Sequence, residues 1–237
     1  MTVDTDYYTN CFTPHPHDPE MRILFSAMFH HSTDTTDIRL AVSTDGRFFE
    51  WVSREPVIDN FDAECNFYSQ VYAYPTLIPI GGEDVGLLFS RHENGHDDWS
   101  GDMYGKEFES HYSMAFWKSD RLAGVKISQT GEFYTDLNLK SGRLQINFRT
   151  LSPKGYVTVA LQDKNTPIEG FSLNDSAILT GDCNWVDCSW NGNKDLALLP
   201  SMDCKIRIHS ESAIIYGIRV IAQEDTEINT KTTYNAI

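Results

Sequence analysis

The sequence predicts an all-β fold. Short apolar or alternating runs separated by turn residues recur along all 237 residues, and 12% of the residues are aromatic. Aromatic and β-branched side chains favour strands, where they pack across the neighbouring strand. No segment longer than a turn or two has helical periodicity, so no helix is expected. The strand pattern changes near residue 120, and we place a domain boundary there.

The most informative segment runs from Ile38 to Trp51. It predicts a strand over residues 38–43, a polar turn and a second strand over 48–52. An Asp-Gly pair between apolar runs is a strong hairpin signal, because Gly accepts the positive φ of the turn. We expect the carboxylate of Asp45 to accept hydrogen bonds from backbone N–H groups of this turn, which is a structural role.

The rest of the first domain contains further strands. Residues 22–29 form the first convincing one, and residues 85–90 are continuously apolar, as in a buried central strand. Two prolines interrupt residues 71–80, which favours short or edge strands. Residues 91–110 are polar and indicate a long loop, a feature that is uncommon without a function. Residues 113–117 form the last strand before the boundary.

The second domain, residues 120–222, has shorter and more regularly spaced strands. We expect them at residues 144–149, 156–161, 185–190, 205–209 and 213–220. Strands spaced by roughly 8–12 residues with turns between them are typical of a β-sandwich. The polar residues 223–237 are expected to form a flexible tail.

Composition excludes several classes of partner. The formal charge is −15, from 19 basic and 34 acidic residues, whereas nucleic acids and anionic membranes select basic surfaces. The sequence contains no run of about 18 apolar residues, so no membrane span is predicted. The N-terminus lacks the features of a signal peptide, which leaves the localisation open. Five cysteines without a Cys-x-x-Cys pair indicate neither a zinc site nor a disulfide framework, and no cofactor or metal is expected.

The chain resembles the C-terminal part of bacterial glycoside-hydrolase-like proteins related to families 32 and 43. The resemblance covers residues 6 to 220 and rests on the order of several motifs, which are Asp6–Asn10, Ile38–Trp51, Arg54–Ile58, Asp120–Gly124, Gly131–Thr135, Leu144–Arg149, Val157–Asp163, Ile168–Leu173 and Gly181-Asp182. It implies a β-propeller followed by a β-sandwich, carbohydrate as the ligand, and a parent family that is often secreted.

The chain departs from this family in length. Such a propeller has about five blades, whereas residues 1–119 leave room for about two blades at roughly 40–50 residues each. The earlier blades, which carry the nucleophile or base in these families, are not in the sequence. We therefore expect a fragment, a shortened protein, or a homo-oligomer that supplies missing blades in trans.

Asp62 and Glu64 are the candidate catalytic residues. Hydrolysis of a glycosidic bond requires two carboxylates that flank it, and Glu64-Cys65 superficially matches the general-acid signature of family 32. The flanking residues depart from that signature. The alternative is that both are solvated loop acids.

Five residues after the predicted central strand are candidates for ligand binding, namely Arg91, His92, Glu93, His96 and Trp99. Arginine and histidine can donate hydrogen bonds to sugar hydroxyls, and Trp99 can stack on a sugar face. His92 to His96 also matches the letters of the zinc-protease motif, but that chemistry requires a helix, and Asn94-Gly95 predicts a turn. The alternative is a polar surface loop with Trp99 packed locally.

In the second domain, Trp185, Trp190 and Tyr216 offer either a carbohydrate platform or core side chains, and alternating aromatic residues favour the core. Two functions follow for the whole chain. The first is a glycoside-hydrolase-like protein that acts on or binds carbohydrate and is inactive as an isolated monomer. The second is a non-catalytic module for carbohydrate binding or assembly.

Overall fold

The computed structural model describes residues 4–16, 18, 20–96, 109–139, 141–196, 199 and 202–222. The predicted all-β class is confirmed, since the described residues form strands and a single short 3-10 helix, η1 (Ser119–Arg121). The chain divides into two compact units, Met1–Ser119 and Asp120–Ile237, so the division falls at the residue where the sequence pattern changes. The predicted flexible tail at 223–237 lies outside the described residues.

The first unit begins with a five-stranded antiparallel sheet. Its central strands are β3 (Arg22–His30) and β4 (Thr35–Ser43), both of which the sequence predicts. The order is β1-β3-β4-β5, with β2 also paired to β3. The flanking strands are β1 (Thr5–Tyr7), β2 (Phe12–Pro14) and β5 (Glu50–Trp51). The sequence analysis did not predict β1 and β2, which are too short to show a periodicity.

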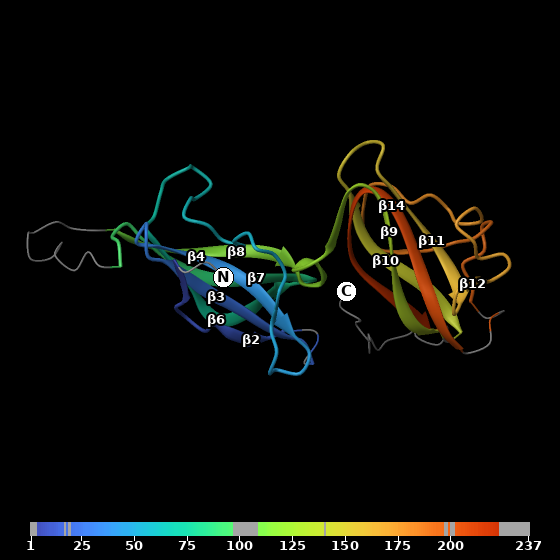
Figure 1. Cartoon of the computed structure of the whole chain (residues 1–237), viewed down its shortest axis with the longest axis horizontal. Helices are drawn as coiled ribbons and strands as arrows, with labels where there is room; N and C mark the ends of the chain where they lie inside the picture. The colour runs from blue at the N-terminus through green and yellow to red at the C-terminus, as the bar shows by residue number, and fades with distance from the viewer. Residues whose placement is uncertain are drawn as a thin grey trace, which may run out of the picture. The chain divides into compact units, whose positions relative to one another are not determined.

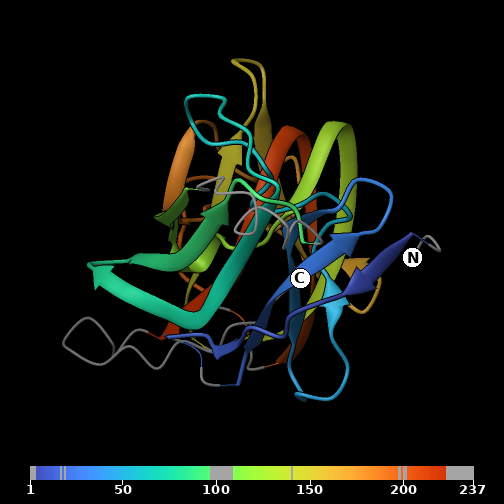
Figure 2. The ribbon, with the colours of Figure 1, turned by 90° about the vertical axis from the view of Figure 1, so that its left-hand side faces the viewer.

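The predicted hairpin is confirmed between β4 and β5, which pair antiparallel with Ala41 opposite Trp51. Its turn is the light blue loop in Figures 1 and 2. Oδ1 of Asp45 accepts hydrogen bonds from the backbone N–H groups of Arg47 (2.8 Å) and Phe48 (2.9 Å). These bonds hold the pKa of Asp45 below its ordinary value, and the bond from Phe48 makes the largest contribution. Gly46 has φ +71°, so the expected structural roles of both turn residues are confirmed.

A three-stranded antiparallel sheet completes the unit, in the order β6-β7-β8. Its strands are β6 (Gln70–Gly81), β7 (Asp84–His92) and β8 (Ser110–Lys118). The predicted central strand is confirmed as β7. The proline-containing segment is an edge strand, as expected, but it is one strand of 12 residues rather than several short ones, because register shifts after Ala73 and Pro79 accommodate the prolines.

The two faces of the three-stranded sheet differ. One face carries buried Val71, Leu87 and Phe89, and Trp117 of β8 stacks on Phe25 of the first sheet at 6.0 Å between ring centroids. The other face exposes a group of large apolar side chains, comprising Tyr74, Ile80, Tyr112 and Phe116. Two consecutive antiparallel sheets suit the two blades that the resemblance implies, but the propeller assignment stays a prediction.

The second unit forms one six-stranded sheet. Its strands are β9 (Val125–Leu139), β10 (Gly142–Thr150), β11 (Tyr156–Asp163), β12 (Thr166–Pro167), β13 (Asp182–Asp187) and β14 (Met202–Ala222). The long strand β14 pairs with β11 through its first half, with β10 through its second half, and with β9 along most of its length. It bends along its length (Figures 1 and 2) and thereby curls the sheet.

Some predicted strand limits in this unit are wrong. The two strands predicted at 205–209 and 213–220 are a single strand, because a bulge at Ser212 (φ 47°) bends β14 without ending it. The strand predicted at 185–190 lies at Asp182–Asp187, and β9 was not predicted as a strand. Among the described residues the sheet is continuous, so a sandwich of two separate sheets stays a prediction.

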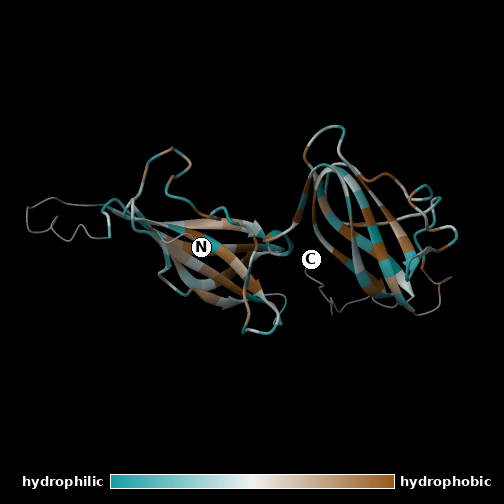
Figure 3. Cartoon of the chain, in the orientation of Figure 1, coloured by the Kyte–Doolittle hydropathy of each residue, from teal (hydrophilic) through white to brown (hydrophobic). Residues whose placement is uncertain are grey.

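The inner face of this curled sheet forms the core of the second unit. Alternate residues of its strands are buried together, among them Leu144, Ile146, Val159, Leu161 and Ile208. Figure 3 shows the resulting alternation of brown and teal along β14 and its neighbours. This period-2 pattern is what a sheet with one buried face requires.

Candidate functional site

The largest group of predicted site residues lines one open cleft of about 670 Å³ in the first unit. One wall is the loop between β5 and β6, drawn in cyan in Figure 1, and the other is the buried face of β7 and β8. The cleft brings together Asp62 and Glu64, the candidate catalytic pair, and Arg91, a candidate for ligand binding. The remaining lining residues are Pro56, Val57, Ile58, Asp59, Phe61, Ala63, Phe89, Ser113, Met114 and Ala115.

Asp62 organises the loop wall. Its Oδ1 accepts hydrogen bonds from the backbone N–H groups of Glu64 (2.9 Å) and Asn66 (2.8 Å). Its Oδ2 accepts from the side-chain amide of Asn66 (3.0 Å) and the hydroxyl of Tyr68 (3.4 Å). The bonds from Asn66 are the main reason that the pKa of Asp62 lies below its ordinary value. Asp62 therefore folds the loop tightly and leaves Glu64 exposed at its tip.

Arg91 joins the two walls of the cleft. Its Nη2 donates a hydrogen bond to the carbonyl oxygen of Phe61 (3.1 Å), and its guanidinium carbon lies 4.8 Å from the ring centroid of Phe89 and 5.5 Å from that of Tyr68. Its Nε is buried and has no hydrogen-bond partner among the described residues. A buried donor without a partner is costly.

Asp62 does not have the properties of a glycosidase general acid. A glycosidase needs one carboxylic acid whose pKa is raised, so that it stays protonated and can donate to the leaving group. The pKa of Asp62 is lowered instead, and both of its oxygens accept hydrogen bonds from the loop. This carboxylate is therefore poorly suited to the acid role. The carboxylate of Glu64 has no partner among the described residues and is available to a ligand.

The lowered pKa of Asp62 predicts how the loop responds to acid. An acid with a depressed pKa stabilises the folded loop fully above its unfolded value, here 3.8, and the contribution is lost as the pH falls through the folded pKa. We expect the amide resonances of Glu64 and Asn66 to titrate together with a midpoint below pH 3.8, and Asp62→Asn to abolish that titration. NMR on the full chain measures both effects, and a midpoint at or above 3.8 would contradict the assignment.

His92 lies on the opposite face of the sheet from Arg91, because successive residues of β7 alternate, and His96 follows the end of that strand. Both ring nitrogens of His92 are engaged, Nδ1 with the Ser110 hydroxyl (2.8 Å) and Nε2 with that of Ser90 (3.1 Å), and burial lowers its pKa. Nε2 of His96 lies 2.5 Å from the hydroxyl of Tyr8. The predicted cluster after β7 is thus divided between two faces.

These two histidines share a group of aromatic rings. Tyr8 lies 4.9 Å from His96 and 5.9 Å from Tyr72, and Tyr72 lies 5.8 Å from His92, between ring centroids. Burial raises the pKa of Tyr72 to about 12, so its hydroxyl remains a hydrogen-bond donor, here to Gln70. Residues 93–96 contain no helical turn, as the Asn94-Gly95 pair predicts. Trp99 lies outside the described residues.

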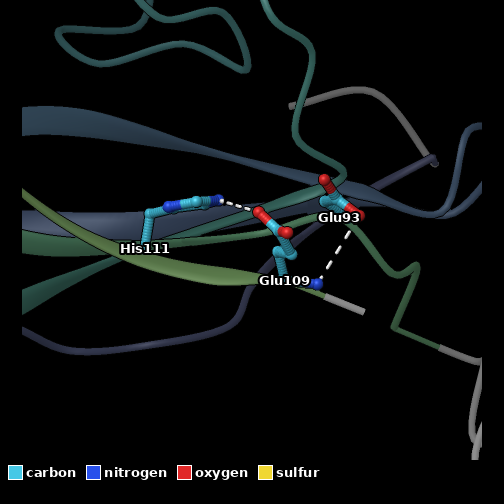
Figure 4. Close-up of side chains that lie close together, drawn as sticks. All are labelled: Glu93, Glu109 and His111. Carbon is cyan, nitrogen blue, oxygen red and sulfur yellow. Dashed lines mark hydrogen bonds and ion pairs between the residues drawn. The ribbon is translucent and has the colours of Figure 1, made fainter. Parts of the chain in front are cut away.

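Glu93 belongs to a third group, near the Arg91 side of the sheet. Figure 4 shows Glu93, Glu109 and His111 side by side, with Nε2 of His111 3.3 Å from a carboxylate oxygen of Glu109. One ligand atom from each lies within 4.8 Å of the others, which is close enough for a metal ion. The sequence analysis expected no metal site. All three are at least partly exposed, and acidic surface groups often gather without a metal.

The three aromatic candidates of the second unit, Trp185, Trp190 and Tyr216, make contacts within that unit. Trp190 is 2% exposed and lies in the core, as the sequence favoured. Trp185 is half-buried, donates from Nε1 to Asp120 (2.7 Å), and has Arg219 over its ring at 4.1 Å. Arg121 covers the ring of Tyr216 in the same way, at 4.9 Å.

Sequence reasoning missed Tyr68, Asp59 and His111. Asp59 lines the cleft, Tyr68 bonds Asp62, and the ring of His111 packs edge-on against Tyr68 at 5.5 Å. The only local signal was the density of polar and aromatic residues between Asp59 and Tyr68. Their meeting depends on the pairing of β7 with β8 and on the path of the loop.

A scan against protein-family models finds no match for this chain, and a search of curated proteins finds no relative. In the described part of the chain, no helix has the length and apolar character needed to cross a bilayer.

Proposed function

We propose that the first unit binds a neutral carbohydrate in the cleft between the Asp62 loop and β7, and that this chain does not hydrolyse it. One observation carries the proposal. The Glu64 carboxylate, an acceptor without a partner, lines the same open cleft as Arg91, whose guanidinium is cationic and whose buried Nε has no partner among the described residues. A sugar hydroxyl both donates and accepts, so neighbouring hydroxyls of one ring can bond both side chains.

The walls of the cleft suit the same ligand. Phe61, Phe89 and Ala115 provide apolar surface for the C–H faces of a sugar ring. Asp59, Asp62 and Glu64 line this cleft and disfavour an anionic occupant. The resemblance to glycoside-hydrolase-like proteins, which stays a prediction, supports the same ligand class.

A panel of neutral tri- and tetrasaccharides of glucose, xylose, arabinose and fructose tests the proposal. We expect millimolar binding by at least one of them, with NMR shift changes confined to residues 59–64, Arg91 and 113–115, and no release of reducing ends. Glu64→Gln removes a charged acceptor and should weaken binding about tenfold. Glu55→Gln is the matched control, because Glu55 is exposed and does not line the cleft.

Two results would refute this proposal. The absence of shift changes with every member of the panel at millimolar concentration would exclude carbohydrate binding at the cleft. Turnover that Glu64→Gln abolishes would show that the chain is a hydrolase.

Assembly is the second candidate function, and the exposed apolar face of β6–β8 favours it. Tyr112 is 72% exposed and Phe116 61%, while Ile80 and Met114 pack together over Gly86. Contiguous apolar surface of this kind marks interaction sites in soluble proteins. Formation of a homo-oligomer, or the supply of missing blades in trans, stays a prediction.

A further inference from the structure

A second cavity, of about 560 Å³, lies in the first unit and belongs to none of the groups described above. β1, β3, β4 and β5 and the segment after β5 contribute to it. The lining residues are Asp4, Thr5, Tyr7, Met28, His30, Arg39, Trp51, Ser53 and Arg54. Nothing in the sequence analysis selected these residues as a site.

An aromatic pair forms one wall of this cavity. The rings of Tyr7 and Trp51 are stacked, with centroids 5.5 Å apart and planes inclined by 10°. Nε1 of Trp51 donates a hydrogen bond to the hydroxyl of Tyr7 (3.2 Å), which fixes the two rings relative to each other. Pairing of Tyr7 with Met28 and of Trp51 with Ala41 anchors both residues to the sheet. Tyr7 is 55% and Trp51 37% exposed, so the pair offers a prebuilt stacking surface.

Arg39 and Arg54 are the arginines that line the cavity. The buried carboxylate of Asp37 binds Nε and Nη2 of Arg39, at 3.0 and 3.1 Å, and thereby fixes that guanidinium. Within the described residues, no ion pair or hydrogen bond engages Arg54. The one acidic side chain that lines the cavity, Asp4, is already bonded to the backbone N–H (2.9 Å) and hydroxyl (2.6 Å) of Ser32. The Asp4 carboxylate keeps its negative charge in these bonds and Arg39 is paired, so Arg54 is the one guanidinium of the cavity that has no partner among the described residues.

We propose that this cavity binds an acidic sugar, a pyranose that carries a carboxylate, as in a uronic-acid oligosaccharide. The C–H face of the ring lies on the Tyr7–Trp51 pair, and the carboxylate pairs with the guanidinium of Arg54. Guanidinium and carboxylate match in a planar, bidentate geometry. At physiological salt the Debye length is about 8 Å, so the contact between a carboxylate and Arg54 is screened much less than the repulsion from distant acidic residues.

A nucleotide is the main competing occupant, because a base can also stack and a phosphate is anionic. Phosphate sites commonly use the backbone N–H groups of a helix N-terminus. The described residues contain no α-helix, so no such group lines this cavity. A phosphate would therefore depend on the arginines alone, as a carboxylate does, and the test includes adenosine monophosphate to distinguish the two anions.

Calorimetric titration of the full chain with trigalacturonate, and with its fully methyl-esterified form, tests the proposal. We expect the free acid to bind at least about tenfold more tightly than the neutral ester, because the ester loses the charged hydrogen bonds to Arg54. Arg54→Gln should remove that difference, and Trp51→Ala should weaken binding of both forms. Arg47→Gln is the matched control, since it removes an exposed arginine of the neighbouring turn that does not line the cavity.

Further arms separate the possible outcomes. Trp51→Phe keeps a stacking ring and should retain most of the affinity. It therefore tests the stacking contact even if Trp51→Ala does not fold. Glu64→Gln in the other cleft should leave trigalacturonate binding unchanged, so the two proposals can fail separately. Equal affinity for acid and ester, binding unaffected by Arg54→Gln, or tighter binding of adenosine monophosphate than of trigalacturonate would each overturn the assignment.

Discussion

Replacing Trp190 with alanine is expected to lower the free energy of unfolding of the second unit by about 3–5 kcal/mol. The side chain is 2% exposed and packs against Phe171, with ring centroids 5.0 Å apart. Its Nε1 donates a 2.7 Å hydrogen bond to the carbonyl oxygen of Val159 in β11. The substitution removes the largest of the fully buried side chains and leaves that oxygen without its donor. Urea unfolding of the full chain, followed by hydrogen exchange in β10 and β11, measures the loss.

Trp190→Phe separates packing from hydrogen bonding. It retains most of the ring but leaves the Val159 oxygen unpaired, which should cost about 1–3 kcal/mol. Tyr134→Ala in β9 is the control, because Tyr134 is an aromatic residue of the same sheet that is 46% exposed, and its loss should change stability little. Equal effects of Trp190→Ala and Tyr134→Ala would show that Trp190 does not belong to the core.

The fold could be predicted where local chemistry determines it. The Asp-Gly turn, the apolar run of β7 and the prolines of β6 each act within a few residues, and the structure confirms the turn, the central strand and the edge strand. The prediction failed where the pairing with a distant strand determines the length of an element. The polar residues around Ser212 look like a turn, yet β9 pairs on both sides of them and keeps β14 continuous through a bulge.

The site was less predictable for the same reason. Asp62 and Arg91 were selected as separate candidates, and only the path of the loop between β5 and β6 brings them into one cleft. Arg91 and His92 were selected together because they are adjacent, but alternation along a strand places them on opposite faces. Recognising β7 as a strand to its end at His92 would have predicted that separation from the sequence.

Replacing Asp37 with alanine is expected to destabilise the first unit by about 3 kcal/mol, near the lower end for breaking a buried ion pair. The carboxylate side chain is only 9% exposed. It receives two hydrogen bonds from Arg39 and lies 2.8 Å from Nε2 of His30. These two partners are 24% and 22% exposed, so water replaces the lost acceptor only in part. Hydrogen exchange in β3 and β4 measures the change.

An exposed ion pair of the same unit provides the matched control. Lys118 and Asp84 lie 2.8 Å apart but are 48% and 45% exposed, and Asp84→Ala should cost no more than about 1 kcal/mol. Adding Arg39→Met to Asp37→Ala should recover part of the loss, because the unpaired guanidinium, rather than the missing carboxylate, is the costly group. If the double variant is no more stable than Asp37→Ala, then the packing around Asp37, and not the buried charge, determines how much Asp37 contributes to the stability of the unit. The arginine geometry proposed for the acidic-sugar cavity would then depend on that packing.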